Sequence, residues 1–141
     1  MATDLYVKQA GDGPAVVLLH GLFGAGANLG ALARALRATY SVFSVDLPGH
    51  GRSAWIANPT LPAMAEKLRL WLEEAGLSRA HFVGHSLGGK VAMELALQQP
   101  GRVSTLTVAD TAPVAYQAHH DALFAAREAV ATRPCASREE A

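Results

Sequence analysis

A Gly-x-Ser-x-Gly pattern at residues 84–88 is the feature that most constrains the fold of this chain. It follows an apolar stretch that favours a strand and precedes residues 90–99, whose apolar side chains recur at helical spacing. Glycine at positions 84 and 88 lets the strand and the helix meet in a tight turn, where side chains would collide. The pattern therefore predicts that Ser86 stands exposed at a helix N-terminus, which favours negative charge. An ordinary glycine-rich turn is the alternative.

Strands and helices alternate along the chain. The continuous apolar run Ala15–Leu19 is typical of a strand buried on both faces of a parallel sheet. Helical spacing predicts helices over 28–39 and 60–75, with Asn28 as N-cap and Gly76 as C-cap, and one more within 114–133. Strands are expected at 5–9, 15–19, 40–45, 80–83 and 103–109. The pattern predicts an α/β fold with a doubly wound, mostly parallel sheet.

Candidate functional residues follow the expected strands at their carboxyl ends. Leu22, Asp46, Ser86 and Asp110 each come soon after a different strand. In doubly wound folds the ligand binds at this edge of the sheet. The coincidence at four strands is much harder to obtain by chance than one short motif, and it predicts a site at this edge.

The chemistry that these residues support is nucleophilic attack by a serine. A serine hydroxyl needs a base and also donors for the oxyanion that forms on the attacked carbonyl. We expect those donors to be the backbone N–H groups of Leu87, at the head of the helix, and Leu22, where Gly21 permits close approach. Asp110 is suited to orient a basic imidazole, although a turn aspartate is the alternative reading. Asp46 precedes a Pro- and Gly-rich loop, which favours a structural role.

The general base is harder to assign among the 6 histidines. Two follow Asp110, in the order nucleophile, acid, histidine, but His119 and His120 follow too closely to lie after a further strand. Either of them could also stand at the solvated start of a helix. The others are disfavoured because they belong to loop motifs, adjoin Ser86 or lie at the far end of its strand: His20, His50, His85 and His81.

Composition excludes several classes of function. Lys plus Arg and Asp plus Glu are 12 each, so the net charge of zero argues against nucleic acid and anionic membranes as partners. The single cysteine, Cys135, permits no internal disulfide and lies in a polar tail, so it is not expected to be catalytic. Without a signal-like or membrane-spanning apolar run, the expected location is the cytoplasm. We expect no cofactor and no metal ion.

Four ordered blocks resemble the α/β-hydrolase superfamily, and more narrowly its bacterial short-chain carboxylesterases with mitochondrial relatives. They are residues 20–24, 46–53, 84–90 and 108–116, and the similarity extends over residues 5–130. The resemblance implies the α/β-hydrolase fold. It identifies residues 1–113 as the N-terminal part of the core and residues 114–141 as the start of a helical cap followed by a frayed tail.

Length is where the chain departs from that family. The family pattern continues after the acid with the rest of the cap, two more strands and a loop that bears the catalytic histidine. The resemblance therefore implies that the sheet is truncated before its last strands. The strand at 103–109 would then form an open apolar edge, through which we expect self-association or cover by a second chain.

The function that the resemblance implies is a carboxylesterase-like serine hydrolase of class EC 3.1.1. It would cleave short-chain esters or thioesters through an acyl-enzyme on Ser86, with Asp110 as the acid, and would be impaired because the catalytic histidine is missing. A C–C hydrolase, a cofactor-free peroxidase, or a scaffold that binds a partner without catalysis remain alternatives. Dehalogenases and epoxide hydrolases are disfavoured because they carry aspartate where this chain has Ser86.

Overall fold

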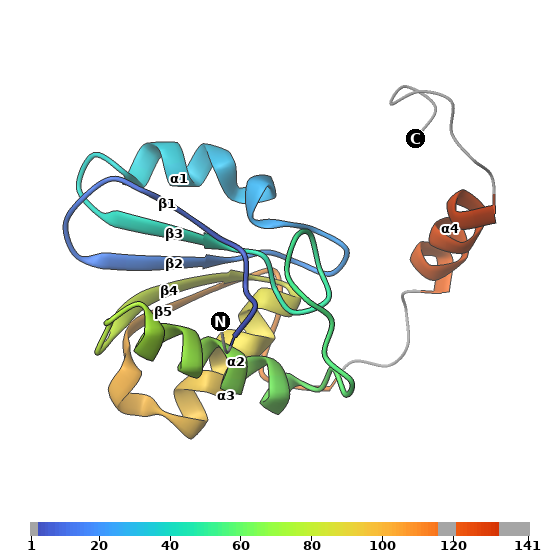
Figure 1. The fold of residues 1–141 in the computed structure, drawn as a ribbon. Helices are drawn as coiled ribbons and strands as arrows, with labels where there is room; N and C mark the ends of the chain where they lie inside the picture. Colours follow the sequence, from blue (N-terminus) through green and yellow to red (C-terminus); the bar gives the residue numbers. More distant parts are fainter. Residues whose placement is uncertain (1–2, 116–120, 133–141) are drawn as a thin grey trace.

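A five-stranded sheet forms the centre of the protein in a computed structural model, which describes residues 3–115 and 121–132 (Figure 1). The strand order is β1-β3-β2-β4-β5. The bounds are Val7–Ala10 for β1, Ala15–Leu19 for β2, Ser41–Val45 for β3, Ala80–His85 for β4 and Val103–Ala109 for β5. β1 is antiparallel to β3, and the other neighbours are parallel. The predicted α/β fold with a mostly parallel sheet is confirmed.

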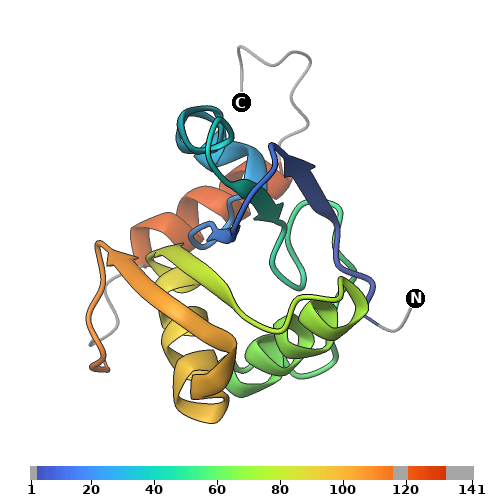
Figure 2. The same cartoon turned by 90° about the vertical axis from the view of Figure 1, so that its left-hand side faces the viewer.

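Helices cover both faces of this sheet (Figure 1). One face carries η1 (Gly26–Leu29) and α1 (Gly30–Leu36), and the other carries α2 (Leu61–Glu74) and α3 (Leu87–Gln98). A short turn, η2 (Pro100–Arg102), connects α3 to β5, and α4 (Asp121–Thr132) follows the sheet. In Figure 2, β1 and β5 lie at opposite edges of the twisted sheet.

β2 contributes to the core on both faces, which explains its unbroken apolar sequence. Val17 and Leu19 belong to the larger cluster, beneath α2 and α3, whereas Val16 and Leu18 belong to the smaller cluster beneath α1. Burying such a side chain contributes about 1.5–3 kcal/mol. The core therefore fixes β2 between the helical layers, and it fixes the position at which the chain leaves the sheet towards residue 20.

The predicted start of the first helix was wrong. The chain from residue 26 first forms a 3-10 turn, so Asn28 lies inside η1 and is not the N-cap of α1; its Oδ1 accepts a 2.6 Å hydrogen bond from the Ala25 N–H. α3 begins at Leu87 with Ser86 as its cap residue, which agrees with the expectation that Leu87 stands at the head of the helix. Gly76 has a φ of 68° directly after α2, which fits the predicted helix stop.

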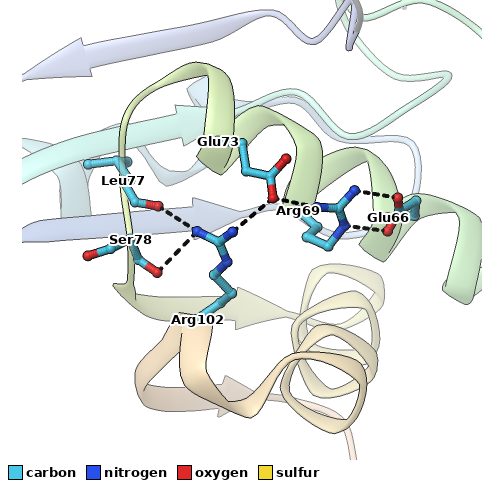
Figure 3. Close-up of polar contacts among 6 residues, drawn as sticks. All are labelled: Glu66, Arg69, Glu73, Leu77, Ser78 and Arg102. Carbon is cyan, nitrogen blue, oxygen red and sulfur yellow. Dashed lines mark hydrogen bonds and ion pairs between the residues drawn. The ribbon is translucent and has the colours of Figure 1, made fainter.

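Arg102 ties the end of α2 to the connection before β5 (Figure 3). Its guanidinium donates to the Glu73 carboxylate at 2.9 Å and to the carbonyls of Leu77 and Ser78 at 3.3 Å each. Glu73 also accepts from Arg69, which pairs with Glu66. These contacts hold α2 against the end of α3 and so support the two helices that pack beneath the tight turn at residues 84–88, which is called the elbow below.

β5 forms one edge of the described sheet and pairs there with β4. Its side chains alternate, with Leu106 and Val108 half-buried and Thr105 and Thr107 exposed. The edge is therefore less uniformly apolar than the sequence suggested. Self-association through it, and the domain boundary at residue 113, stay predictions.

Candidate active site

Ser86 occupies a strained turn between β4 and α3. Its φ of 50° and ψ of −113° are unusual for a residue with a side chain, and such a conformation costs on the order of 1–3 kcal/mol. A Cβ on Gly84 would lie 2.5 Å from the Gly89 nitrogen, and one on Gly88 would lie 2.3 Å from the Leu19 carbonyl oxygen. Glycine is thus required at both positions, as the motif predicted.

The loop after β2 lies directly beside this turn. A Cβ on Gly21 would be 3.5 Å from the Ser86 Cβ and 3.0 Å from Nδ1 of His85. In the part of the chain that the structure describes, neither the Leu22 N–H nor the Leu87 N–H donates a hydrogen bond. The two predicted oxyanion donors therefore lie on either side of Ser86, and within the described residues their N–H groups are not used in the hydrogen bonds of a helix or a strand.

Asp110 follows β5 at the same edge of the sheet. Its Oδ2 lies 3.7 Å from Nε2 of His85, and the side chains are 86% and 47% exposed, respectively. The Ser86 N–H donates to the carbonyl of Ala109 at 3.0 Å, which fixes the elbow against the end of β5. The predicted nucleophile and acid thus directly follow neighbouring parallel strands, with His85 beside both.

Asp46 shapes a turn. The carboxylate is buried, and it accepts hydrogen bonds from the Gly26 N–H at 2.6 Å and the Arg52 N–H at 2.9 Å. A Cβ on Gly51 would lie 2.1 Å from Asp46 Oδ2, so glycine lets the loop close around the carboxylate. These contacts fit the structural role that its Pro- and Gly-rich loop suggested.

No described histidine hydrogen-bonds to the Ser86 hydroxyl. His20 contacts the Gly21 carbonyl and accepts from Leu47, His50 contacts the Pro48 carbonyl, and His81 contacts Thr105 at the far end of β4. Burial lowers the pKa of His20, while its bond to Gly21 acts in the opposite direction. His119, His120, Cys135 and the predicted frayed tail lie outside the described residues.

Lys90 is a residue that the sequence reasoning did not single out. Its ammonium donates to the carbonyls of Ala112 and Val114 and so ties the segment after Asp110 to α3. An apolar groove of about 590 Å³ lies along this side of α3, lined by Leu61, Leu87, Lys90, Met93, Glu94, Leu97, Pro113, Val114 and Ala115. The groove begins next to the elbow but does not include Ser86.

Residues 3–115 and 121–132 contain no group of three or more His, Cys, Asp or Glu side chains that could hold a metal ion. No described helix is both long enough and apolar enough to cross a membrane.

Known proteins resemble this chain over most of its length. Esterase YbfF of Escherichia coli is 40% identical over 127 residues, which are 89% of this chain and 50% of that protein. The mouse sn-1-specific diacylglycerol lipase ABHD11 is 43% identical over 121 residues, covering 83% of this chain and 39% of that protein. A solved structure described as a marine microorganism esterase superposes with a TM-score of 0.82 at 32% identity, covering 91% of this chain and 49% of that one.

The chain thus spans about half the length, or less, of these relatives. The family described as having the alpha/beta hydrolase fold matches residues 14–134, which include the elbow and the segments flanking it. This match agrees with the observed sheet order and with the strained turn at Ser86. The chain therefore belongs to the α/β-hydrolase fold family, within which it resembles bacterial esterases.

Proposed function

We propose that this protein provides the nucleophile of a serine hydrolase that cleaves short-chain carboxylic esters or thioesters. The observation that carries the proposal is the left-handed, strained conformation of Ser86, at a helix N-terminus and beside a glycine loop. Such strain persists only where the surrounding structure enforces it, and it clusters at functional sites. The relatives named esterase and diacylglycerol lipase support ester chemistry in particular.

In the proposed reaction the Ser86 Oγ passes its proton to a base as it attacks the carbonyl carbon of the substrate, and the base later returns this proton to the leaving group. The carbonyl π electrons move to its oxygen, where the Leu22 and Leu87 N–H groups stabilise the negative charge. Each such donor typically contributes about 3 kcal/mol to the transition state. The tetrahedral intermediate then expels the alcohol or thiol, which takes up a proton, and leaves an acyl group on Ser86. Water repeats the sequence and releases the carboxylic acid.

The described residues do not supply a group that could accept the proton of the Ser86 hydroxyl. No described histidine hydrogen-bonds to the Ser86 hydroxyl. In the proposal, Asp110 would orient an imidazole from beyond the described residues, and the chain by itself would be a slow catalyst. Oxyanion stabilisation and binding leave some residual catalysis in such enzymes when the base is removed.

The test is the hydrolysis of p-nitrophenyl acetate by the full chain and by Ser86→Ala. The proposal predicts slow turnover that the substitution abolishes, together with an acetyl adduct on Ser86 in the intact protein. Ser78→Ala is the matched control, because Ser78 is exposed at the opposite end of the sheet. Equal rates for the parent chain and Ser86→Ala would refute catalysis by this chain.

A second candidate is a binding scaffold without catalysis. It is favoured by one observation: the Asp110 carboxylate faces His85, and His85 makes no hydrogen bond to Ser86 in the described part of the chain. A scaffold would bind ester-like ligands and leave them intact. Binding of a non-hydrolysable ester analogue, with no acyl adduct and no turnover at high protein concentration, would select this candidate over the hydrolase.

We place the protein in the cytoplasm, acting on small molecules and not on nucleic acid, in agreement with its zero net charge. The β5 edge has no partner strand within the described residues, which supports self-association through that edge. Sedimentation across a concentration series tests this, and a monomer at every concentration would contradict it.

A further inference from the structure

The carbonyl of Gly21 is held from two directions. It accepts a hydrogen bond from the Gly24 N–H at 3.0 Å and lies 2.7 Å from Nδ1 of His20. This carbonyl shares a peptide plane with the Leu22 N–H, and the described chain has no cis peptide bonds. In a trans peptide the C=O and N–H groups point in opposite directions. Whatever holds the Gly21 oxygen therefore also sets the direction of the Leu22 N–H.

The second nitrogen of the His20 ring settles where its proton lies. The Leu47 N–H donates to Nε2 at 2.9 Å, and a backbone N–H can only donate. Nε2 must therefore carry a lone pair, so the single proton of the neutral ring is on Nδ1 and is donated to Gly21. His20 thus bridges the loop after β2 to the segment that follows β3.

Burial gives this bridge its rigidity. His20 is 1% exposed and Leu47 is fully buried, so water does not replace either hydrogen bond. The titratable groups that face the ring are His50, with ring centroids 5.1 Å apart, and the Asp46 carboxylate, which already accepts from two backbone N–H groups. Neither of them donates to the Gly21 oxygen, so that donation falls to His20 and Gly24.

We propose that His20 is a positioning residue of the Ser86 site, which holds the Gly21 carbonyl as the Nδ1–H tautomer and thereby aims the Leu22 N–H at the oxyanion. This role rests on the proposed function of Ser86 as a nucleophile. It assigns a task to a buried histidine that is not itself placed to exchange a proton with Ser86.

Two substitutions separate the two hydrogen bonds of the ring. In His20→Asn the side-chain amide nitrogen is attached to Cγ, as Nδ1 is, so it keeps a donor for Gly21 and loses the acceptor for Leu47. In His20→Gln the amide oxygen reaches the position of Nε2, so it keeps the acceptor for Leu47 and loses the donor. A role in aiming Leu22 depends on the first bond, whereas a merely structural bridge depends on both.

The readout is the reaction of the full chain with a fluorophosphonate, resolved into the binding constant KI and the rate constant kinact. We expect His20→Gln to lower kinact by about 10²-fold with KI unchanged, which is the effect of losing one oxyanion donor. His20→Asn should keep kinact within about threefold of the parent chain even where its stability falls. Equal losses in the two variants, or losses confined to KI, would overturn the proposal.

A second measurement does not depend on reactivity and distinguishes failure here from failure of the proposed function. Nitrogen-15 spectra of the imidazole should show His20 protonated at Nδ1 and unprotonated at Nε2. The Leu22 amide signal should shift in His20→Gln and stay in place in His20→Asn. A ring protonated at Nε2 refutes the positioning role even if Ser86 reacts. An unreactive Ser86 together with the expected spectra refutes only the hydrolase.

Discussion

Nε2 of His85 and Oδ2 of Asp110 lie 3.7 Å apart at the carboxyl ends of β4 and β5. The parallel register pairs His85 with Ala109 and so brings the two side chains together. Asp110 has a φ of 57°, so the chain turns sharply as it leaves β5. The carboxylate that the proposal assigns to orient a base therefore already faces an imidazole, but that imidazole is not hydrogen-bonded to Ser86.

Replacing His85 tests whether this neighbour acts as a base in the isolated chain. We expect His85→Ala to label with a fluorophosphonate at a rate within about threefold of the parent chain, because general bases contribute about 10²–10⁴-fold and His85 makes no bond to the Ser86 hydroxyl. Asp110→Asn is the companion variant and should behave alike. A loss of about 10²-fold in His85→Ala alone would identify His85 as the base.

The strained conformation of Ser86 predicts that glycine at this position stabilises the fold relative to alanine, although either substitution removes the hydroxyl. Ser86→Gly and Ser86→Ala both remove the hydroxyl, but glycine adopts a φ of 50° without penalty. Relief of about 1–3 kcal/mol of strain, less about 0.4–1 kcal/mol of added chain entropy, leaves Ser86→Gly more stable than Ser86→Ala by about 1 kcal/mol. Urea unfolding measures the difference. Equal stabilities would mean that the turn stores no strain.

The close approach of Gly88 to β2 predicts a severe effect of a single methyl group. A Cβ there would meet the Leu19 carbonyl oxygen at 2.3 Å, and backbone cannot move aside as a side chain can. We expect Gly88→Ala to cost more than about 3 kcal/mol of unfolding free energy. Gly101→Ala is the matched control, since a Cβ at that position meets nothing within 4 Å. Similar unfolding midpoints for the two variants would contradict the packing of the elbow.

The buried His20 predicts that acid destabilises the fold. Burial lowers its pKa in the folded state below the unfolded value of 6.5, so the unfolded chain binds more protons as the pH falls. The contribution of His20 to stability is therefore complete above pH 6.5 and is lost as the pH falls below that value.

Urea titrations at about pH 8 and about pH 5 measure this loss. His20→Asn should reduce the decline of unfolding free energy towards acid pH. The control, His81→Asn, changes a histidine that bonds Thr105 at the far end of β4 and should keep the decline. A steeper loss towards alkaline pH, or an unchanged decline in His20→Asn, would contradict the assignment.

The sequence predicted the sheet because its signals are local. Ala15–Leu19 is apolar at every position since β2 packs on both faces, and the 84–88 pattern marks the turn because glycine is sterically required there. The start of α1 was not predicted correctly because it depends on a contact with residues far away in the sequence. A Cβ on Gly26 would lie 3.1 Å from the backbone of Ser44, so the chain first passes β3 closely and turns as η1.

The positions of the candidate residues in the fold could be predicted from the sequence, whereas their contacts could not. The placement of Leu22, Ser86 and Asp110 after strands followed from the rule for parallel sheets. The contact between Asp110 and His85 depends on the register of β4 with β5, and the bond from Leu47 to His20 depends on where β3 ends relative to β2. Neither strand register can be predicted from a local sequence pattern.

Reaction with a fluorophosphonate, followed by mapping of the modified peptide, shows whether the turn at residues 84–88 activates Ser86. We expect the folded chain to be modified at Ser86, and faster than the urea-unfolded chain, while Ser86→Ala is not modified. Modification spread over other serines, or an equal rate in the unfolded chain, would show that the elbow does not activate its serine and would contradict the account.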